Sequence, residues 1–134
     1  MAEFLQHSMN TTASPTGPDA LEAAMLDTYP ARGKKFEIDF GEDGPFGPFA
    51  ADLSISDRDD TLTFLVTRGS LLDKSETCEF HATAVCDDIW MVSWREADGL
   101  TVVQVQDFAQ GKVRSAVTTP ENDLVYLEGT LRFL

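Results

Sequence analysis

The sequence predicts an all-β protein, an eight-stranded antiparallel up-and-down barrel with a short helix before the first strand. Along most of the chain, apolar and polar residues alternate with a period of two, which places them on opposite faces of a sheet. Breaker segments rich in Gly, Pro and Asp separate these runs. Eight strands can close into a barrel that is filled by side chains or holds one small ligand.

The strands follow from this alternation in order along the chain. The first run is clear because Phe36, Ile38 and Phe40 alternate with Glu37 and Asp39. The expected strands are residues 36–40, 49–55, 61–67, 76–85, 89–96, 101–108, 112–119 and 124–133. The 134 residues, 43% of them hydrophobic, can bury one core but not two.

Two tight turns are expected within residues 89–119. Asp98-Gly99 and Gln110-Gly111 tolerate the positive φ angles that a primed hairpin turn requires. The three strands that they join therefore form a β-meander.

A helix is expected over Ala20–Leu26, before the strands. Thr16 suits the N-cap, Asp19 follows it at the spacing of a capping box, and Pro30 would end the helix. We interpret this helix as a lid or plug over one end of a barrel domain that spans residues 16–134. Residues 1–15 are polar and lack a period, which is typical of a disordered tail or of an extension without significance.

Charge and hydropathy exclude several classes of partner. The formal net charge is −13, and the ten Lys and Arg are spread along the chain rather than clustered as a nucleic-acid partner requires. The same sign disfavours an anionic membrane surface. No apolar run approaches the ~20 residues that span a bilayer, and no signal-peptide pattern is present. We therefore expect a cytoplasmic protein. Whether it is a monomer or a homodimer is left open by the sequence.

No metal site and no cofactor are expected. Of the two histidines, His7 lies in the expected tail. Cys78 and Cys86 lie mostly along one strand, and at about 3.3 Å per residue they would be roughly 26 Å apart. Nucleophile-elbow, dinucleotide and phosphate-loop motifs are absent. Any chemistry must therefore use scattered acids, His81, Tyr126, arginines or a thiol.

Strand parity nominates Glu96 and His81 as candidate catalytic groups. Glu96 shares the side of Trp90 and Trp94, near the rim of the barrel. His81 is either a surface residue or a base that faces the cavity. Tyr126 is expected outside, because the apolar residues of the last strand alternate with it.

Asp107 is the third candidate catalytic group. Gln104 and Gln106 suit solvent, so Val103, Val105 and Asp107 are expected to face inward. The alternative is that Asp107 is a solvated acid at the end of a hairpin.

A ligand-binding wall is expected on the aromatic side of the sheet. Two indoles on one strand can pack in a core or form a flat wall for a planar ligand. Residues 40–49 suggest a loop at the barrel mouth, as a gate or an irregular connection. We expect a pocket gated by residues 41–48 and by the helix. The expected ligand-contacting residues are Phe36, Ile38, Phe40, Phe46, Phe49, Phe64, Trp90, Trp94 and Val105.

The chain resembles a known family over about residues 33–134. The run DDIWMVSWREADGLTVVQVQDFAQGKV, the later TTP and the terminal LEGTL are similar to MoaF-like proteins, which are small lipocalin-like barrels. More distantly, GKKF at 33–36, the element VSW followed by Glu96 at 92–96, and DF at 107–108 resemble phenolic acid decarboxylases of the same calycin-like architecture. The resemblance implies a barrel with a ligand cavity.

The departures from the decarboxylases weigh against that reaction. Ile38 and Phe40 stand where that family has the two tyrosines that hold the substrate carboxylate. The catalytic glutamate of the family falls near Asp87, and Leu65 stands about where it has an arginine.

Two functions remain open. One is a small metal-independent enzyme of the lyase, isomerase or cyclase type, which acts on a planar or apolar metabolite by acid/base chemistry. The other is a binding or carrier protein without chemistry. Two ionisable groups that converge in one cavity would favour the enzyme.

Overall fold

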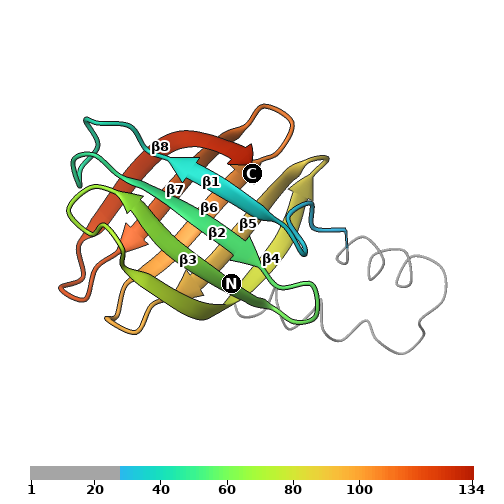
Figure 1. Ribbon diagram of the computed structural model, residues 1–134, viewed down its shortest axis with the longest axis horizontal. Coiled ribbons are helices and arrows are strands. Elements are labelled where there is room, and N and C mark those ends of the chain that lie inside the picture. Colours follow the sequence, from blue (N-terminus) through green and yellow to red (C-terminus); the bar gives the residue numbers. More distant parts are fainter. Residues whose placement is uncertain (1–27) are drawn as a thin grey trace.

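The computed structural model describes residues 28–134, which form one closed β-barrel (Figure 1). Its strands are β1 (Lys35–Asp39), β2 (Ala50–Ile55), β3 (Thr61–Arg68), β4 (Ser75–Cys86), β5 (Ile89–Arg95), β6 (Thr101–Asp107), β7 (Lys112–Thr118) and β8 (Leu124–Phe133). Each strand pairs antiparallel with the next, and β8 pairs with β1 to close the barrel. The predicted barrel is thus confirmed for these residues.

Two parts of the sequence prediction lie outside the described residues. These are the tail at 1–15 and the helix over Ala20–Leu26. Within residues 28–134, no helix is long and apolar enough to cross a membrane.

The alternating apolar residues fill the interior, as their period predicts. Trp90 and Trp94 are 4% and 7% exposed, and both lie on the inner face of β5. On β8, Leu127 and Leu131 are buried while Tyr126 is 66% exposed. The two indoles therefore share one face, and Tyr126 points outward as expected.

Strand β6 faces the opposite way from the sequence prediction. Gln104 and Gln106 are 2% and 0% exposed inside the barrel, whereas Val105 is 42% exposed on the outer face. Val103 and Asp107 alternate with the two glutamines and so share the side of Val105. The prediction that Val103, Val105 and Asp107 face inward is wrong.

The turn before β6 explains this reversal. Glu96 N–H donates to Leu100 O at 2.8 Å and Gly99 N–H donates to Glu96 O at 2.9 Å, which leaves a loop of three residues between Glu96 and Leu100. Within this loop only Gly99 has a positive φ, at 97°, whereas a two-residue type I′ turn needs two. One extra loop residue shifts the register by one and moves every side chain of β6 to the other face.

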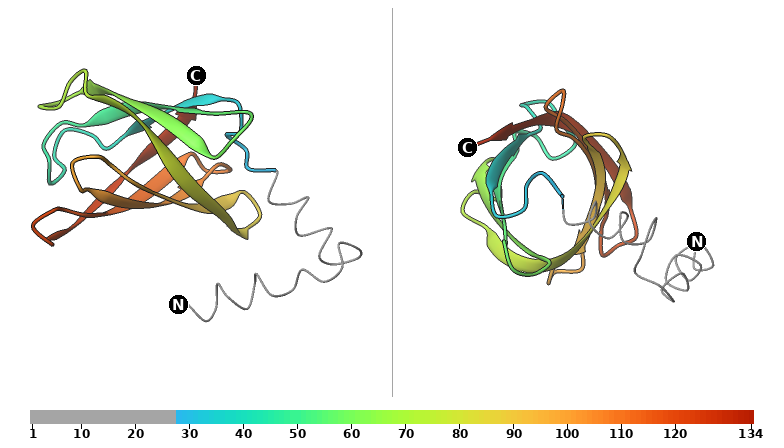
Figure 2. Two further views of the ribbon diagram at one scale, coloured as in Figure 1. Left: turned by 90° about the horizontal axis from the view of Figure 1, so that it is seen from below. Right: turned by 90° about the vertical axis from the view of Figure 1, so that its right-hand side faces the viewer.

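One end of the barrel is closed by the segment that precedes β1. In the view along the barrel, this segment curves across the opening (right panel of Figure 2). Tyr29 is 2% exposed, and its ring lies 5.3 Å from the Trp90 ring and 5.7 Å from the Phe108 ring, measured between centroids. The Tyr29 hydroxyl donates to Gln106 Oε1 at 2.6 Å. Among the described residues, these contacts fill this end of the barrel, whereas a cavity opens at the opposite end.

Candidate functional site

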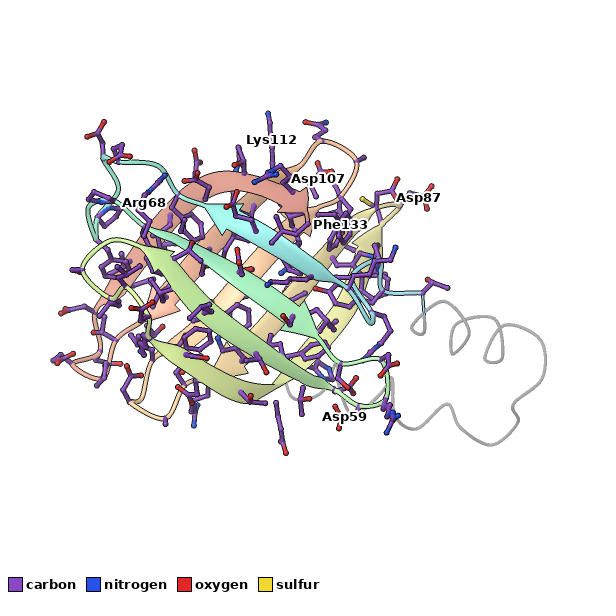
Figure 3. All side chains as sticks on the ribbon, in the orientation of Figure 1. Asp59, Arg68, Asp87, Asp107, Lys112 and Phe133 are labelled. Atoms are coloured by element: carbon purple, nitrogen blue, oxygen red, sulfur yellow. The ribbon has the colours of Figure 1, made fainter. Side chains whose placement is uncertain are left out.

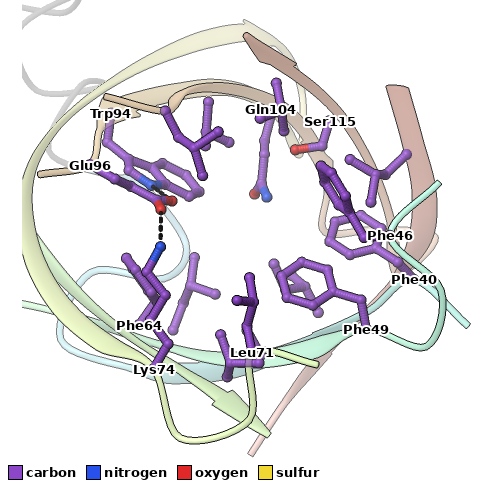
Figure 4. A pocket seen from close by; sticks show the side chains of 18 residues that line it. Phe40, Phe46, Phe49, Phe64, Leu71, Lys74, Trp94, Glu96, Gln104 and Ser115 are labelled. Carbon is purple, nitrogen blue, oxygen red and sulfur yellow. Dashed lines mark hydrogen bonds and ion pairs between the residues drawn. The ribbon is translucent and has the colours of Figure 1, made fainter. Parts of the chain in front are cut away.

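A cavity of about 140 Å³ lies inside the other end of the barrel (Figure 4). It opens beside the β1–β2 loop at residues 40–49 and the β3–β4 turn at 69–74. Its apolar lining is Ile38, Phe40, Phe46, Phe49, Ala51, Leu53, Phe64, Val66, Leu71, Trp94, Leu100, Val102, Val117 and Leu127. Its polar lining is confined to Lys74, Glu96, Gln104 and Ser115.

Three phenylalanines form one side of the cavity mouth. The rings of Phe40 and Phe49 stack with their centroids 5.7 Å apart, and Phe46 meets Phe49 edge-on at 6.2 Å. Such pairs are the favoured arrangements of aromatic side chains. Phe46 is 39% exposed, so its ring also faces solvent at the entrance.

Ionic contacts hold the β1–β2 loop against the rim. Asp39 Oδ1 accepts a hydrogen bond from Arg68 Nη2 at 2.6 Å and another from the Gly41 backbone N–H at 2.8 Å. Glu42 lies 3.8 Å from the same guanidinium group. The loop lies at the barrel mouth, as the sequence predicts, and Asp39 fixes its first residues.

Glu96 and Lys74 form an ion pair at the rim of the cavity (Figure 4). Lys74 Nζ lies 3.2 Å from Glu96 Oε1 and 2.8 Å from Asp98 Oδ2. The other oxygen of Glu96 accepts a hydrogen bond from the Trp94 indole N–H at 3.2 Å. The Glu96 side chain is only 10% exposed, whereas that of Asp98 is 46% exposed.

Burial makes Glu96 a weaker acid than an exposed carboxyl group. It raises the pKa of Glu96 despite the hydrogen bonds from Trp94 and Lys74. At Asp98 the hydrogen bond from Lys74 dominates and lowers the pKa. Burial disfavours the charged form of Lys74, but its bonds to Asp98 and Glu96 raise the pKa overall. Lys74 is therefore a stable cation that pairs with both Glu96 and Asp98. Because its charge is shared between two carboxylates, it neutralises the charge of Glu96 only in part.

The floor of the cavity is polar. Gln104 and Ser115, which are paired across β6 and β7, are 2% and 4% exposed and both line the cavity. Gln104 Oε1 accepts a hydrogen bond from Gln106 Nε2 at 2.9 Å. Because Gln106 in turn accepts from Tyr29, three side chains connect the closed end of the barrel to this floor.

Most of the predicted ligand-contacting residues surround the cavity. Six of them line it: Ile38, Phe40, Phe46, Phe49, Phe64 and Trp94. Phe36 and Trp90 are buried towards the closed end, where their rings contact Phe108 and Tyr29 respectively. Val105 lies on the outer face, because β6 has the reversed orientation described above.

The structure separates the three candidate catalytic residues. Glu96 lines the cavity, but His81 is exposed on the outer face of β4, where it alternates with buried Phe80. Asp107 lies at the β6–β7 turn (Figure 3), where its Oδ1 accepts hydrogen bonds from the backbone N–H groups of Ala109 and Gln110 at 3.0 Å each. Asp107 is thus the hairpin-end acid of the alternative interpretation.

Three cavity residues were not predicted from the sequence: Lys74, Gln104 and Ser115. Val92 pairs with Gln104, and Gln104 pairs with Ser115, so the side chains of Val92, Gln104 and Ser115 share the inner face of the barrel. A three-residue turn before β6 would have predicted this register, since directly paired residues share a face. Lys74 lies in a turn rather than in a strand, so parity carries no information about it.

Metal-ligating and thiol side chains do not gather into a second site within residues 28–134. Residues 28–134 contain no group of three or more His, Cys, Asp or Glu that could hold a metal ion. Cys78 and Cys86 are both free thiols, the first buried and the second exposed.

Residues 28–134 thus form a small closed β-barrel with an apolar cavity whose polar groups lie at the rim and the floor. The chain belongs to the MoaF-like family, whose model matches residues 32–132. A crystal structure from Burkholderia vietnamiensis, described as a "putative beta-lactamase", is similar with 28% sequence identity and a TM-score of 0.70. The similarity covers 78% of this chain and 96% of that one. No curated protein matches the chain.

Proposed function

We propose that the protein binds a small, mostly apolar metabolite in the open end of the barrel. The observation that carries the proposal is the cavity itself, with about 140 Å³ of space between aromatic and aliphatic side chains. Apolar walls with a few placed polar groups are typical of small-molecule sites. A cavity of roughly 150 Å³ accommodates one benzene ring. The ligand is therefore one ring or an aliphatic group of similar size.

An acid/base reaction on the bound molecule is the second candidate function. It is favoured by the convergence of Glu96 and Lys74 at the cavity, with burial raising the pKa of Glu96. A carboxyl group with a raised pKa is suited to general acid/base catalysis near neutral pH. In the carrier alternative, Glu96 stays paired with Lys74 and Trp94 and moves no proton.

The name of the Burkholderia relative does not extend to this chain. Serine β-lactamases use a Ser-x-x-Lys motif, which the sequence lacks. A metal-dependent reaction would need a ligand cluster, and residues 28–134 do not form one. We therefore do not propose β-lactam hydrolysis.

Titration with toluene tests the binding proposal. Toluene should shift the Trp94 indole N–H signal in NMR spectra, because this group lies at the cavity. Ala51→Leu fills part of the cavity and should abolish the shift. Ala116→Leu makes the same change at a half-buried position on the outer side of β7 and should preserve it. A toluene shift that survives Ala51→Leu unchanged would place binding elsewhere.

The chemical step is tested separately with a cell extract. Wild-type protein, Glu96→Gln and heat-inactivated protein are incubated with the metabolite fraction, and conversion is followed by mass spectrometry. If the protein is an enzyme that uses Glu96, the wild type should convert a compound that the Glu96→Gln variant binds without converting it. Enrichment of a compound by both forms, with conversion by neither, identifies a carrier.

A further inference from the structure

We propose that Gln104 and Ser115 form a polar subsite at the cavity floor, and that the ligand inserts a hydrogen-bond acceptor there. This inference rests on the proposed function and adds the ligand's chemistry: a small apolar ring with an acceptor, such as a carbonyl oxygen, at the end that enters first. It assigns a role to two side chains that the acid/base hypothesis does not use.

The direction of the hydrogen bonds defines what Gln104 offers. The Tyr29 hydroxyl donates to Gln106 Oε1, and Gln106 Nε2 donates to Gln104 Oε1. The amide oxygens of both glutamines are therefore occupied. Gln104 Nε2 has no hydrogen-bond partner among the described residues, so its N–H groups remain available at the cavity.

The position of Gln104 makes this free donor available to a ligand. The residue as a whole is 2% exposed, yet within residues 28–134 the only fully buried side-chain N or O atom without a partner is Arg68 Nε. The unpartnered Gln104 Nε2 therefore borders the open space of the cavity, where a ligand acceptor can reach it. In Figure 4 its amide points into the open space of the cavity, and the Ser115 hydroxyl lies on the same side. Both groups are held by strands, which fix their positions better than loops do.

The surroundings make the subsite selective. Apart from Gln104 and Ser115, the cavity's polar groups are Lys74 and Glu96 at the rim, and the walls are apolar. A ligand atom at the floor must therefore bond to Gln104 or Ser115 or stay unpaired. Sites built to hydrogen-bond a substrate discriminate strongly against analogues that lack the matching atom.

A pair of probes of similar shape tests the proposal. Toluene and benzonitrile are titrated into the full-length protein, and both the Trp94 indole and the Gln104 side-chain amide signals are followed by NMR. Benzonitrile carries an acceptor where toluene carries a methyl group. One added hydrogen bond predicts that benzonitrile binds about threefold to tenfold tighter, with a shift of the Gln104 amide that toluene does not cause.

Two variants identify the group responsible. Gln104→Leu should abolish the preference for benzonitrile while toluene still binds. Ser115→Ala leaves the bonds between Tyr29, Gln106 and Gln104 intact and should reduce the preference for benzonitrile. It is the test variant to use if Gln104→Leu does not fold. Gln110→Leu makes the same substitution as the first at an exposed position and should keep the wild-type preference.

The outcomes separate this subsite from the proposed function. If neither probe shifts the Trp94 signal, both proposals fail. If toluene binds and benzonitrile binds no tighter, the subsite alone is refuted, and Gln104 is satisfied by water. A preference for benzonitrile that persists in Gln104→Leu and Ser115→Ala also refutes it, because the acceptor then bonds to a group outside the cavity floor.

Discussion

Removing the Tyr29 hydroxyl should destabilise the protein measurably although the ring stays in place. Its bond to Gln106 is 2.6 Å long, and the two residues are 2% and 0% exposed. In Tyr29→Phe, Gln106 Oε1 is left buried without its donor. Leaving such a group unsatisfied costs about 1–3 kcal/mol. No cavity term is added, because the ring contacts with Trp90 and Phe108 remain.

Urea and thermal denaturation measure this cost. For a domain of this size, 1 kcal/mol corresponds to about 4 °C in Tm, so a decrease of about 4–12 °C is expected. Tyr126→Phe is the matched control, since Tyr126 is 66% exposed and its substitution should change stability by less than about 0.5 kcal/mol. Burial raises the pKa of Tyr29, so above about pH 10 wild type should lose stability relative to Tyr29→Phe.

A double-mutant cycle shows whether the two groups act together. Once Gln106→Leu has removed the acceptor, Tyr29→Phe should cost less than it does in wild type. A coupling of about 1 kcal/mol or more is expected for direct partners. If Tyr29→Phe proves as neutral as Tyr126→Phe, the hydroxyl does not bind Gln106 in solution and the connection to the cavity floor is wrong.

Three further predictions follow from the cavity and the turns. Trp94→Ala should lower the free energy of unfolding, measured with urea, by about 3–5 kcal/mol. Met91→Ala, on the outer face of β5, should lower it by less than about 1 kcal/mol. Similar losses in the two variants would mean that the indole is not part of the core. Because burial raises the pKa of Glu96, the folded protein binds its proton more tightly, so stability should fall as pH rises from about 4.5 through the folded pKa. Glu96→Gln should flatten this part of the stability curve, and an unchanged slope would contradict the burial argument. Asp107→Asn keeps the acceptor oxygen of the turn and should change stability by less than about 0.5 kcal/mol, whereas Asp107→Ala should lower it by about 1 kcal/mol. If Asp107→Asn no longer bound toluene, Asp107 would be part of the binding site and the structural role given to it here would be wrong.

The effect of Glu96 on stability falls in a different pH range from the effects of Asp59 and Asp98. Hydrogen bonds from Thr61 and Ser56 lower the pKa of Asp59, and the bond from Lys74 lowers that of Asp98. For such groups stability is lost as pH falls below about 3.8, the ordinary value. The Glu96 effect has the opposite sign and lies above that range.

The strands and the inner face of β5 were determined by the sequence itself. A period of two in local polarity specifies which side chains share a face, and breakers specify where each strand ends. The aromatic wall around Trp94 and the placement of Phe46 and Phe49 at the mouth follow from such local signals. Membership of the MoaF-like family was also visible in the sequence over the region that the family model matches.

The orientation of β6 was decided only by the tertiary structure. Judged by local polarity, Gln104 and Gln106 belong outside and Val105 belongs inside. The three-residue turn before β6 fixes the register instead, and one residue of register inverts a strand. The buried glutamines are then stabilised by Tyr29, 77 residues from Gln106 in the chain. Local patterns carry no record of such a distant partner, so the sequence determined the barrel, and the closed fold determined the polar groups in its cavity.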